Sequence, residues 1–306
     1  MEALMISIKK ILVPVDFSEP SKKAVTYGLT LAKQFNARLI LAHIVPASSA
    51  LPYAFPLETF EIERNQEQTA RREIQQLVPA EYKEECEIRT IVKTGSIDSE
   101  LLGIVRTEAV DLVIMGTHGR RRFSDWFIGS VTERLLRKVP VPLLTVSHVD
   151  PEKHTVGLVA LKRILYATDR FESSSAGLVY AIDLARRAGA HLTVMHAVYY
   201  ADQALWAPAG IPDFDNERLR LSREIRKKID NVFAQEHLQE LPIDIVVDEG
   251  KPFEKILQIA KEIDVDIIVL NLQSKGTLER ALLGATAERV VRLAPIPVLS
   301  IPSTAQ

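Results

Sequence analysis

Short runs of apolar residues alternate along this chain with longer segments in which apolar residues recur at helical spacing. In the first half, the runs predict strands at residues 10–15, 38–45, 86–92, 111–115 and 143–147. Helices are predicted between them at residues 19–36, 57–78, 97–107 and 130–138, with Ser18 as the N-cap of the first. Because the strands are apolar throughout, they belong to a parallel sheet covered by helices on both faces. The pattern therefore predicts an α/β fold.

The whole arrangement occurs twice. The strand that ends at Asp16 recurs as a strand that ends at Asp169, and the strand that carries His43 recurs with His196. A repeat this long indicates two tandem domains. We place them at residues 1–148 and 160–306, joined by a linker.

The last strand of each copy, at residues 143–147 and 298–301, is apolar and is expected at the edge of its sheet. An unpaired edge strand has to be covered or paired. We therefore expect the two domains to pair within one chain as a pseudo-dimer, and a homodimer of two chains stays open.

A glycine-punctuated loop lies between the predicted strand 111–115 and the predicted helix 130–138. It contains Gly116, Gly119, Gly129 and Ser130 in the spacing G-x-x-G-x9-G-S. Glycines let a backbone approach a ligand closely and can adopt φ > 0, and the N–H groups of a following helix attract anions. The chain contains neither the dinucleotide fingerprint G-x-G-x-x-G nor a P-loop. The loop predicts a phosphate site of another kind.

Other candidate residues follow the first, second and fourth strands, at residues 14–16, at His43 and Ile44, and at Met115. In open parallel sheets, ligands bind at the carboxyl ends of the strands. An Asp16 carboxylate accepts hydrogen bonds from a ribose or a base, or else it holds a turn before the helix. Ile44 could provide an apolar wall around an adenine, as could Met115.

The composition of the chain argues against several classes of protein. The chain has 47% hydrophobic residues, and 38 basic and 40 acidic side chains give a formal net charge of −2. This balance lacks the basic footprint of a nucleic-acid-binding protein, and no apolar run approaches the roughly 18 residues of a membrane helix. The first residues lack the basic segment of a secretory signal, and Cys86 is the single cysteine. We expect a cytoplasmic protein that binds neither membrane nor nucleic acid.

With these motifs, the chain resembles a tandem universal stress protein. The resemblance rests on residues 11–16, 115–120, 129–132 and 139–142, and it covers both copies. It implies two flavodoxin-like (Rossmann-like) domains, each with a five-stranded parallel sheet in the order 3-2-1-4-5. ATP-binding members of the family carry the same glycine spacing, so the resemblance implies ATP, with or without Mg²⁺. Its expected nucleotide-binding residues are Pro14, Val15, Asp16, Ile44, Met115, Gly116, His118, Gly119, Arg120, Gly129, Ser130 and Val131.

The second copy departs from this motif. Asn271 stands in the place of Gly116, Ser274 in that of Gly119 and Ala285 in that of Ser130, while Gly284 and Asp169 are kept. Where φ > 0 is required, a residue with a Cβ costs about 1–2 kcal/mol, so the second loop is expected to follow another path. We expect the first domain to bind ATP and the second to act as its structural partner.

Three functions remain open at this point. The first is a nucleotide-dependent sensor or regulator in a stress response. The second is a slow ATPase or an autophosphorylating enzyme with Ser130 as the candidate acceptor, although no group is placed to activate a nucleophile. The third is a nucleotide-independent scaffold. His43 and His196 are expected to pack at strand ends rather than bind metal, because no further ligands occur at suitable spacing.

Overall fold

The structure is a computed structural model. It describes residues 6–46, 56–117, 128–147, 161–168, 176–199, 214–236, 241–272 and 284–302.

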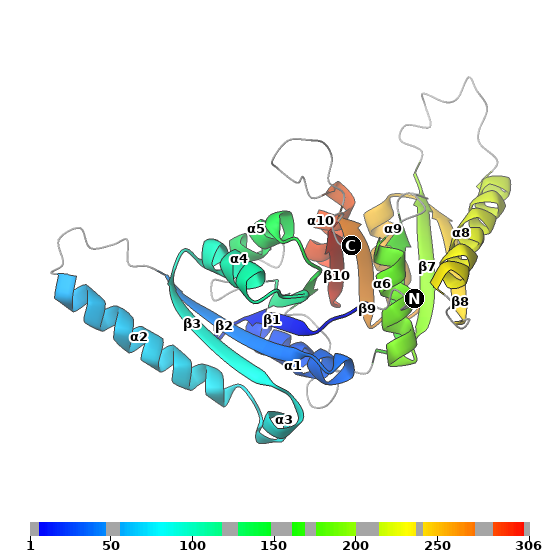
Figure 1. The fold of residues 1–306 in the computed structure, drawn as a ribbon. Coiled ribbons are helices and arrows are strands. Elements are labelled where there is room, and N and C mark those ends of the chain that lie inside the picture. Colours follow the sequence, from blue (N-terminus) through cyan, green and yellow to red (C-terminus); the bar gives the residue numbers. More distant parts are fainter. Residues whose placement is uncertain are drawn as a thin grey trace.

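The first half contains the predicted alternation of strands and helices (Figure 1). Its elements are β1 (Lys10–Pro14), α1 (Glu19–Phe35), β2 (Arg38–Pro46), α2 (Pro56–Gln76), α3 (Ala80–Glu85), β3 (Ile88–Gly95), α4 (Ile97–Thr107), β4 (Leu112–Gly116), α5 (Ser130–Lys138) and β5 (Leu143–Val146). The short helix α3 was not predicted. It has no buried residues, so no apolar periodicity marks it in the sequence.

The second half repeats this order. Its elements are β6 (Arg163–Thr168), α6 (Ala176–Ala188), β7 (His191–Val198), α8 (Phe214–Glu236), β8 (Ile243–Glu249), α9 (Pro252–Glu262), β9 (Ile267–Leu272), α10 (Ala285–Leu293) and β10 (Val298–Pro302).

All the strands form one ten-stranded sheet in the order β3-β2-β1-β4-β5-β10-β9-β6-β7-β8. Within each half the strands are parallel and follow the order 3-2-1-4-5, as the resemblance implied. The halves join where β5 pairs antiparallel with β10, with Leu144 opposite Leu299. The Thr145 hydroxyl also donates to the Val298 carbonyl across this junction, at 3.2 Å. The predicted pairing of the last strands within one chain is confirmed.

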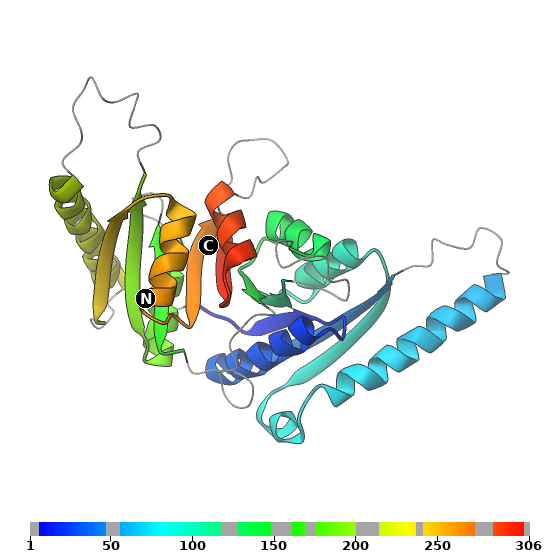
Figure 2. The ribbon, with the colours of Figure 1, turned by 180° about the vertical axis from the view of Figure 1, so that it is seen from behind.

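Helices cover both faces of the sheet, and each face has its own apolar core (Figure 2). One core lies under α1, α2, α6 and α8 and includes Val25, Ile74 and Ile229. The other lies under α4, α5, α9 and α10 and includes Ile104 and Val290. Strands buried on both sides explain why their sequences are apolar throughout.

A repeated aspartate fastens the central strands at their amino ends. Asp111, just before β4, accepts hydrogen bonds from the backbone N–H groups of Lys9 and Lys10 at 2.8 and 2.9 Å. Asp266, just before β9, accepts from Lys162 and Arg163 at 2.7 and 2.8 Å. The same bonds therefore set the start of the first strand in both domains.

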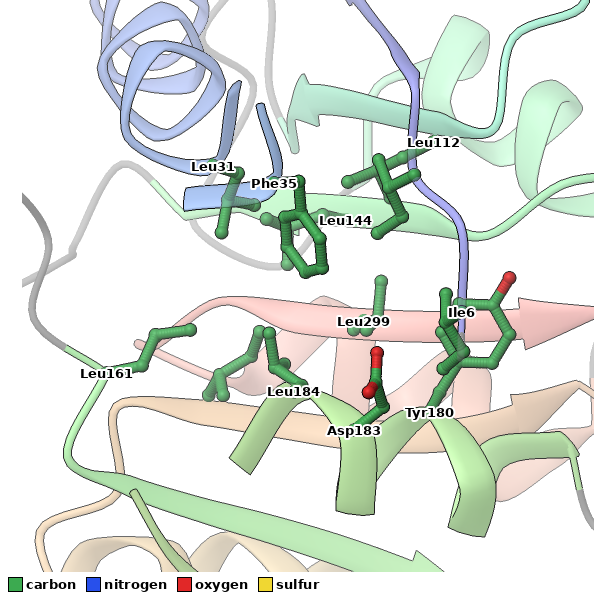
Figure 3. A pocket seen from close by; sticks show the side chains of 12 residues that line it. Ile6, Leu31, Phe35, Leu112, Leu144, Leu161, Tyr180, Asp183, Leu184 and Leu299 are labelled. Carbon is green, nitrogen blue, oxygen red and sulfur yellow. The ribbon is translucent and has the colours of Figure 1, made fainter. Parts of the chain in front are cut away.

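The seam between the domains contains a small apolar cavity of about 20 Å³ (Figure 3). Leu31 and Leu144 line it from the first half, and Leu184 and Leu299 line it from the second. Asp183 is the charged residue of the lining, and its side chain is 5% exposed.

Arg187 of α6 binds both halves beside this cavity. Its Nε donates to Asp183 at 2.7 Å, and its Nη2 donates to the Ile6 carbonyl at 3.2 Å. The guanidinium carbon also lies 5.1 Å from the centre of the Phe35 ring. In Figure 1, the N-terminal end of the described chain accordingly lies beside α6. One side chain thus links α6 to the beginning of the first domain.

Candidate functional site

A cavity of about 1100 Å³ lies at the carboxyl ends of β1, β2 and β4, next to the start of α5. Its lining brings together the nine expected nucleotide-binding residues that the structure describes. These are Pro14, Val15, Asp16, Ile44, Met115, Gly116, Gly129, Ser130 and Val131. His118, Gly119 and Arg120 lie outside the described residues.

The turn from β1 into α1 forms part of the cavity wall and is held by side-chain hydrogen bonds. Asp16 Oδ1 accepts from the Ser18 backbone N–H at 3.0 Å and from the Ser18 hydroxyl at 2.5 Å. Ser18 is the N-cap of α1 and accepts from the Ser21 N–H at 3.4 Å. Asp16 is therefore a turn residue, one of the two roles weighed above, and it also lines the cavity.

Gly116 ends β4 in close contact with the beginning of α1. A Cβ on Gly116 would stand 2.7 Å from Pro20 Cβ and 2.9 Å from the Pro20 carbonyl carbon. Gly116 is not among the described residues with positive φ, and Gly129 has φ −57°. Of the two properties of glycine considered above, close approach and positive φ, these two residues therefore do not use positive φ. At Gly116 the missing Cβ matters because α1 packs against it.

Backbone and side-chain bonds fasten the start of α5 to the end of β4. The Gly129 N–H donates to the Thr117 carbonyl at 2.7 Å, and the Thr132 hydroxyl donates to the Gly116 carbonyl at 3.0 Å. Gly129 is the N-cap, so Ser130 and Val131 begin the first helical turn. The N–H groups of a first turn have no intrahelical acceptor and lie at the positive end of the helix dipole. This end of the cavity can therefore bind an anion.

Residues from α2 and α4 complete the cavity wall, and the sequence did not mark them. The α2 residues share one side of the helix and are polar apart from a buried alanine, and α4 contributes two apolar residues. They are Asn65, Gln66, Thr69, Ala70, Glu73, Ile97 and Leu101. The spacing of Asn65, Thr69 and Glu73 by four residues would indicate a common helix face. Nothing in the sequence indicates that this face adjoins the ends of β1 and β2.

The two repeated histidines make the same contact. His43 Nδ1 lies 2.7 Å from the Val15 carbonyl, and His196 Nδ1 lies 2.8 Å from the Thr168 carbonyl. Each ring braces the turn that follows the neighbouring strand, which agrees with the predicted strand-end packing. Within the described ranges, no group of three His, Cys, Asp or Glu side chains is placed to hold a metal ion.

Comparison with known proteins places the chain in a family. The model of the Universal stress protein family matches residues 7–147 and again residues 160–302. The chain belongs to the universal stress protein family. None of the helices in its described part combines the length and the apolar character that crossing a bilayer requires.

Its relatives include proteins with two domains and proteins with one. A universal stress protein of Mycobacterium tuberculosis is 25% identical over 302 residues, which cover 94% of this chain and 95% of that protein. One of Methanocaldococcus jannaschii is 27% identical over 157 residues, 47% of this chain and 97% of its own length. The crystal structure of a universal stress protein from Archaeoglobus fulgidus has a TM-score of 0.70 at 20% identity. The superposition covers 96% of this chain and 98% of that chain, and at this level of identity the likeness shows a common fold only.

The second universal stress protein domain uses the position of Gly116 differently. Asn271 stands there, its Oδ1 accepting from the Gly177 N–H at 3.0 Å and its Nδ2 donating to the Tyr166 hydroxyl at 2.9 Å. The two hydrogen bonds of this side chain therefore hold α6 against the sheet. Gly284 begins α10 with φ −58° and ψ 139°, as Gly129 begins α5. Ser274 lies outside the described residues, so the path of the second loop is not described.

Proposed function

We propose that this universal stress protein binds one adenine nucleotide, ATP, in its first domain and acts as a nucleotide-dependent regulator. The observation that carries the proposal is the cavity at the carboxyl ends of β1, β2 and β4. Nine residues chosen from the sequence motif line this one cavity, although they come from four separate segments of the chain.

The cavity fits the parts of a nucleotide. Its volume of about 1100 Å³ is slightly above the roughly 300–1,000 Å³ usual for ligand sites. The first turn of α5 offers N–H donors and the Ser130 hydroxyl to phosphate oxygens. Asp16 offers an acceptor to ribose or base, and Ile44 and Met115 offer buried apolar surface. With bound ATP, these residues would hold the triphosphate and the adenosine at different ends of the cavity.

The proposal assigns the second domain a structural role. Its motif has lost two glycines and the hydroxyl, and Asn271 bonds to α6 and Tyr166. Pairing of β5 with β10 gives this domain a role that needs no ligand, since it covers an edge of the first domain's sheet.

Two matched glycines allow a direct test. Gly129 and Gly284 are the N-caps of α5 and α10 with nearly the same φ and ψ. A Cβ on Gly284 would meet no atom within 4 Å. We expect about one ATP per chain by calorimetry and by analysis of released nucleotide. Gly129→Val should abolish binding because its side chain would occupy the phosphate end, and Gly284→Val should leave it unchanged.

Other results would favour the alternatives. Equal loss in both variants would refute the one-site proposal. Release of ADP over many turnovers would identify an ATPase. No binding heat and no bound nucleotide would support the scaffold.

A further inference from the structure

The described sheet ends in two outer strands, β3 and β8, which Figure 1 shows at opposite ends of the molecule. The Leu39 N–H donates to the Glu87 carbonyl, so the odd-numbered residues of β3 face β2 and the even-numbered ones turn their backbone groups outward. In β8 the odd-numbered residues face outward, because the even-numbered Gly250 donates to the Val198 carbonyl of β7. Outward N–H and C=O groups form a template for another strand.

An arginine reaches each outer edge from the neighbouring helix. Arg71 of α2 donates to the Val92 carbonyl of β3 at 3.4 Å, and Arg226 of α8 donates to the Ile243 carbonyl of β8 at 3.0 Å. The two arginines occupy equivalent positions in the two copies, and both are exposed. Both carbonyls face outward, so a donor can reach each edge. A net stabilisation of about 0.5–1.5 kcal/mol for such a bond lets an incoming strand displace the side chain.

The two outer strands carry opposite charge. The charged side chains of β3 are the basic pair Arg89 and Lys93. Those of β8 are Glu249 and the acidic pair Asp244 and Asp248, which occupy the positions equivalent to the basic pair. Like charges on facing strands repel and opposite charges attract. Each outer edge therefore disfavours a second copy of itself and favours the other edge.

The basic and acidic pairs project from the same face of the sheet. Val92 and Val247 belong to the core beneath α1, α2, α6 and α8, and side chains alternate along a strand. Each charged pair is separated from its valine by an odd number of residues, so both pairs lie on the opposite face. Their present partners are surface groups at 2.8–3.5 Å, and such ion pairs contribute about 0–1 kcal/mol, so they can exchange. These pairs are Arg89–Glu108, Lys93–Glu100, Asp244–His191 and Asp248–Lys255.

One register between two chains satisfies both charged pairs. The strands of the two domains run in opposite directions, so β3 of one chain and β8 of the next are antiparallel when the sheet continues with its faces preserved. With Arg89 opposite Asp248, Lys93 stands opposite Asp244. These residues take the non-hydrogen-bonded positions, where facing side chains are closest, and the outward-facing backbone groups of the two strands oppose each other.

The helices beside the outer strands have opposite charge as well. The sequence of α2 contains five acidic and three basic residues, and that of α8 contains five acidic and six basic residues. Both helices pack on the face that bears the core of Ile74 and Ile229, next to β3 and β8 respectively. Continuing the sheet brings them side by side, so the charges are complementary on both faces.

We propose that β3 and β8 form an interaction surface whose partner is a second copy of this chain. In this contact, β8 of one chain pairs antiparallel with β3 of the next. Each chain then keeps one outer strand for a further copy, and such a head-to-tail contact gives rings or open chains. Arg71 and Arg226 compete with the incoming strand for two carbonyls and limit the strength of the contact.

Sedimentation velocity on the full chain tests the proposal. The mass of the unaltered chain should rise with protein concentration at low ionic strength and fall back to a monomer near 1 M salt, where the Debye length is only about 3 Å. Arg71→Gln with Arg226→Gln should tighten the association about tenfold, because the edge carbonyls lose their competing donors. Arg72→Gln with Lys227→Gln is the control for charge and should not tighten it.

Charge reversal identifies the surfaces in contact. Arg89→Glu with Lys93→Glu makes β3 acidic, and Asp244→Lys with Asp248→Lys makes β8 basic. Each of these variants should stay monomeric by itself. A mixture of the two should associate, because acidic edges again meet basic ones, and this recovery also shows that both variants are folded.

Three results would overturn the proposal. The first is an unaltered chain that stays monomeric at every concentration in low salt. The second is an association that persists in either charge-reversed variant alone, since the contact then lies elsewhere on the molecule. The third is a mixture of the two variants that stays monomeric.

Discussion

Replacing Gly116 by alanine tests the contact that joins β4 to α1 beneath the cavity. The added Cβ would stand 2.7 Å from Pro20 Cβ and 2.9 Å from the Pro20 carbonyl carbon, whereas carbon atoms pack best at about 3.5–4.0 Å. Both atoms belong to a rigid proline at the start of a helix, so the elements themselves must separate. Overpacking of this kind costs about 1–3 kcal/mol. We expect Gly116→Ala to lower the free energy of unfolding by that amount and to weaken ATP binding.

Gly103 provides the control, because it lies within α4 and a Cβ there would meet nothing within 4 Å. Gly103→Ala should raise the free energy of unfolding by about 0.5–1 kcal/mol, the usual gain from replacing a glycine inside a helix, and leave ATP binding unchanged. Urea denaturation followed by circular dichroism measures both variants, with the slope m as a check on two-state unfolding. If Gly116→Ala proves as stable as the unaltered protein, the close packing on Pro20 does not restrict this position.

Two further substitutions address the second domain and the seam. Asn271→Gly should lower the free energy of unfolding by about 1–3 kcal/mol, because it removes the bond to the buried Tyr166 hydroxyl. It should not create a second ATP site, and a second bound ATP by calorimetry would contradict this. Arg187→Gln should separate the unfolding of the two domains into distinct thermal transitions, since Arg187 bonds to both halves. Arg186→Gln is the control, because Arg186 pairs with the same Asp183. Two thermal transitions in both variants would show that the bond from Arg187 to the Ile6 carbonyl does not couple the domains.

The fold could be predicted from the sequence wherever local signals determine it. The helices 97–107 and 130–138 agree with α4 and α5 residue for residue, and Ser18 caps α1 as expected. The six residues of α3 follow Pro79 and include no fully buried side chain, so no apolar periodicity marks the helix in the sequence. Local signals thus explain both the agreement and the omission.

The cavity residues divide in a similar way. Parallel strands bring their carboxyl ends to one edge, and the sequence therefore indicated Asp16, Ile44 and Met115. The α2 residues that line the cavity could not be found, because their position depends on how a long helix packs across the strand ends. Of the two reasons given for glycine in this loop, close approach is the one that applies to Gly116, and its partner in the structure is Pro20. That contact joins segments nearly a hundred residues apart and leaves no local signal.

Comparison of the two copies separates bonds that build the fold from residues that build the cavity. Asp111 and Asp266 bind the start of the first strand in the same way, and His43 and His196 bind the same turn. Only the first domain keeps the glycine motif, yet both domains keep these contacts. The contacts therefore stabilise the fold that the two domains share. Gly116 and Phe17, by contrast, line the cavity and correspond to Asn271 and Arg170 in the second copy. A difference in ligand binding between the domains is therefore expected from the motif positions at which the copies differ, such as Gly116 and Ser130.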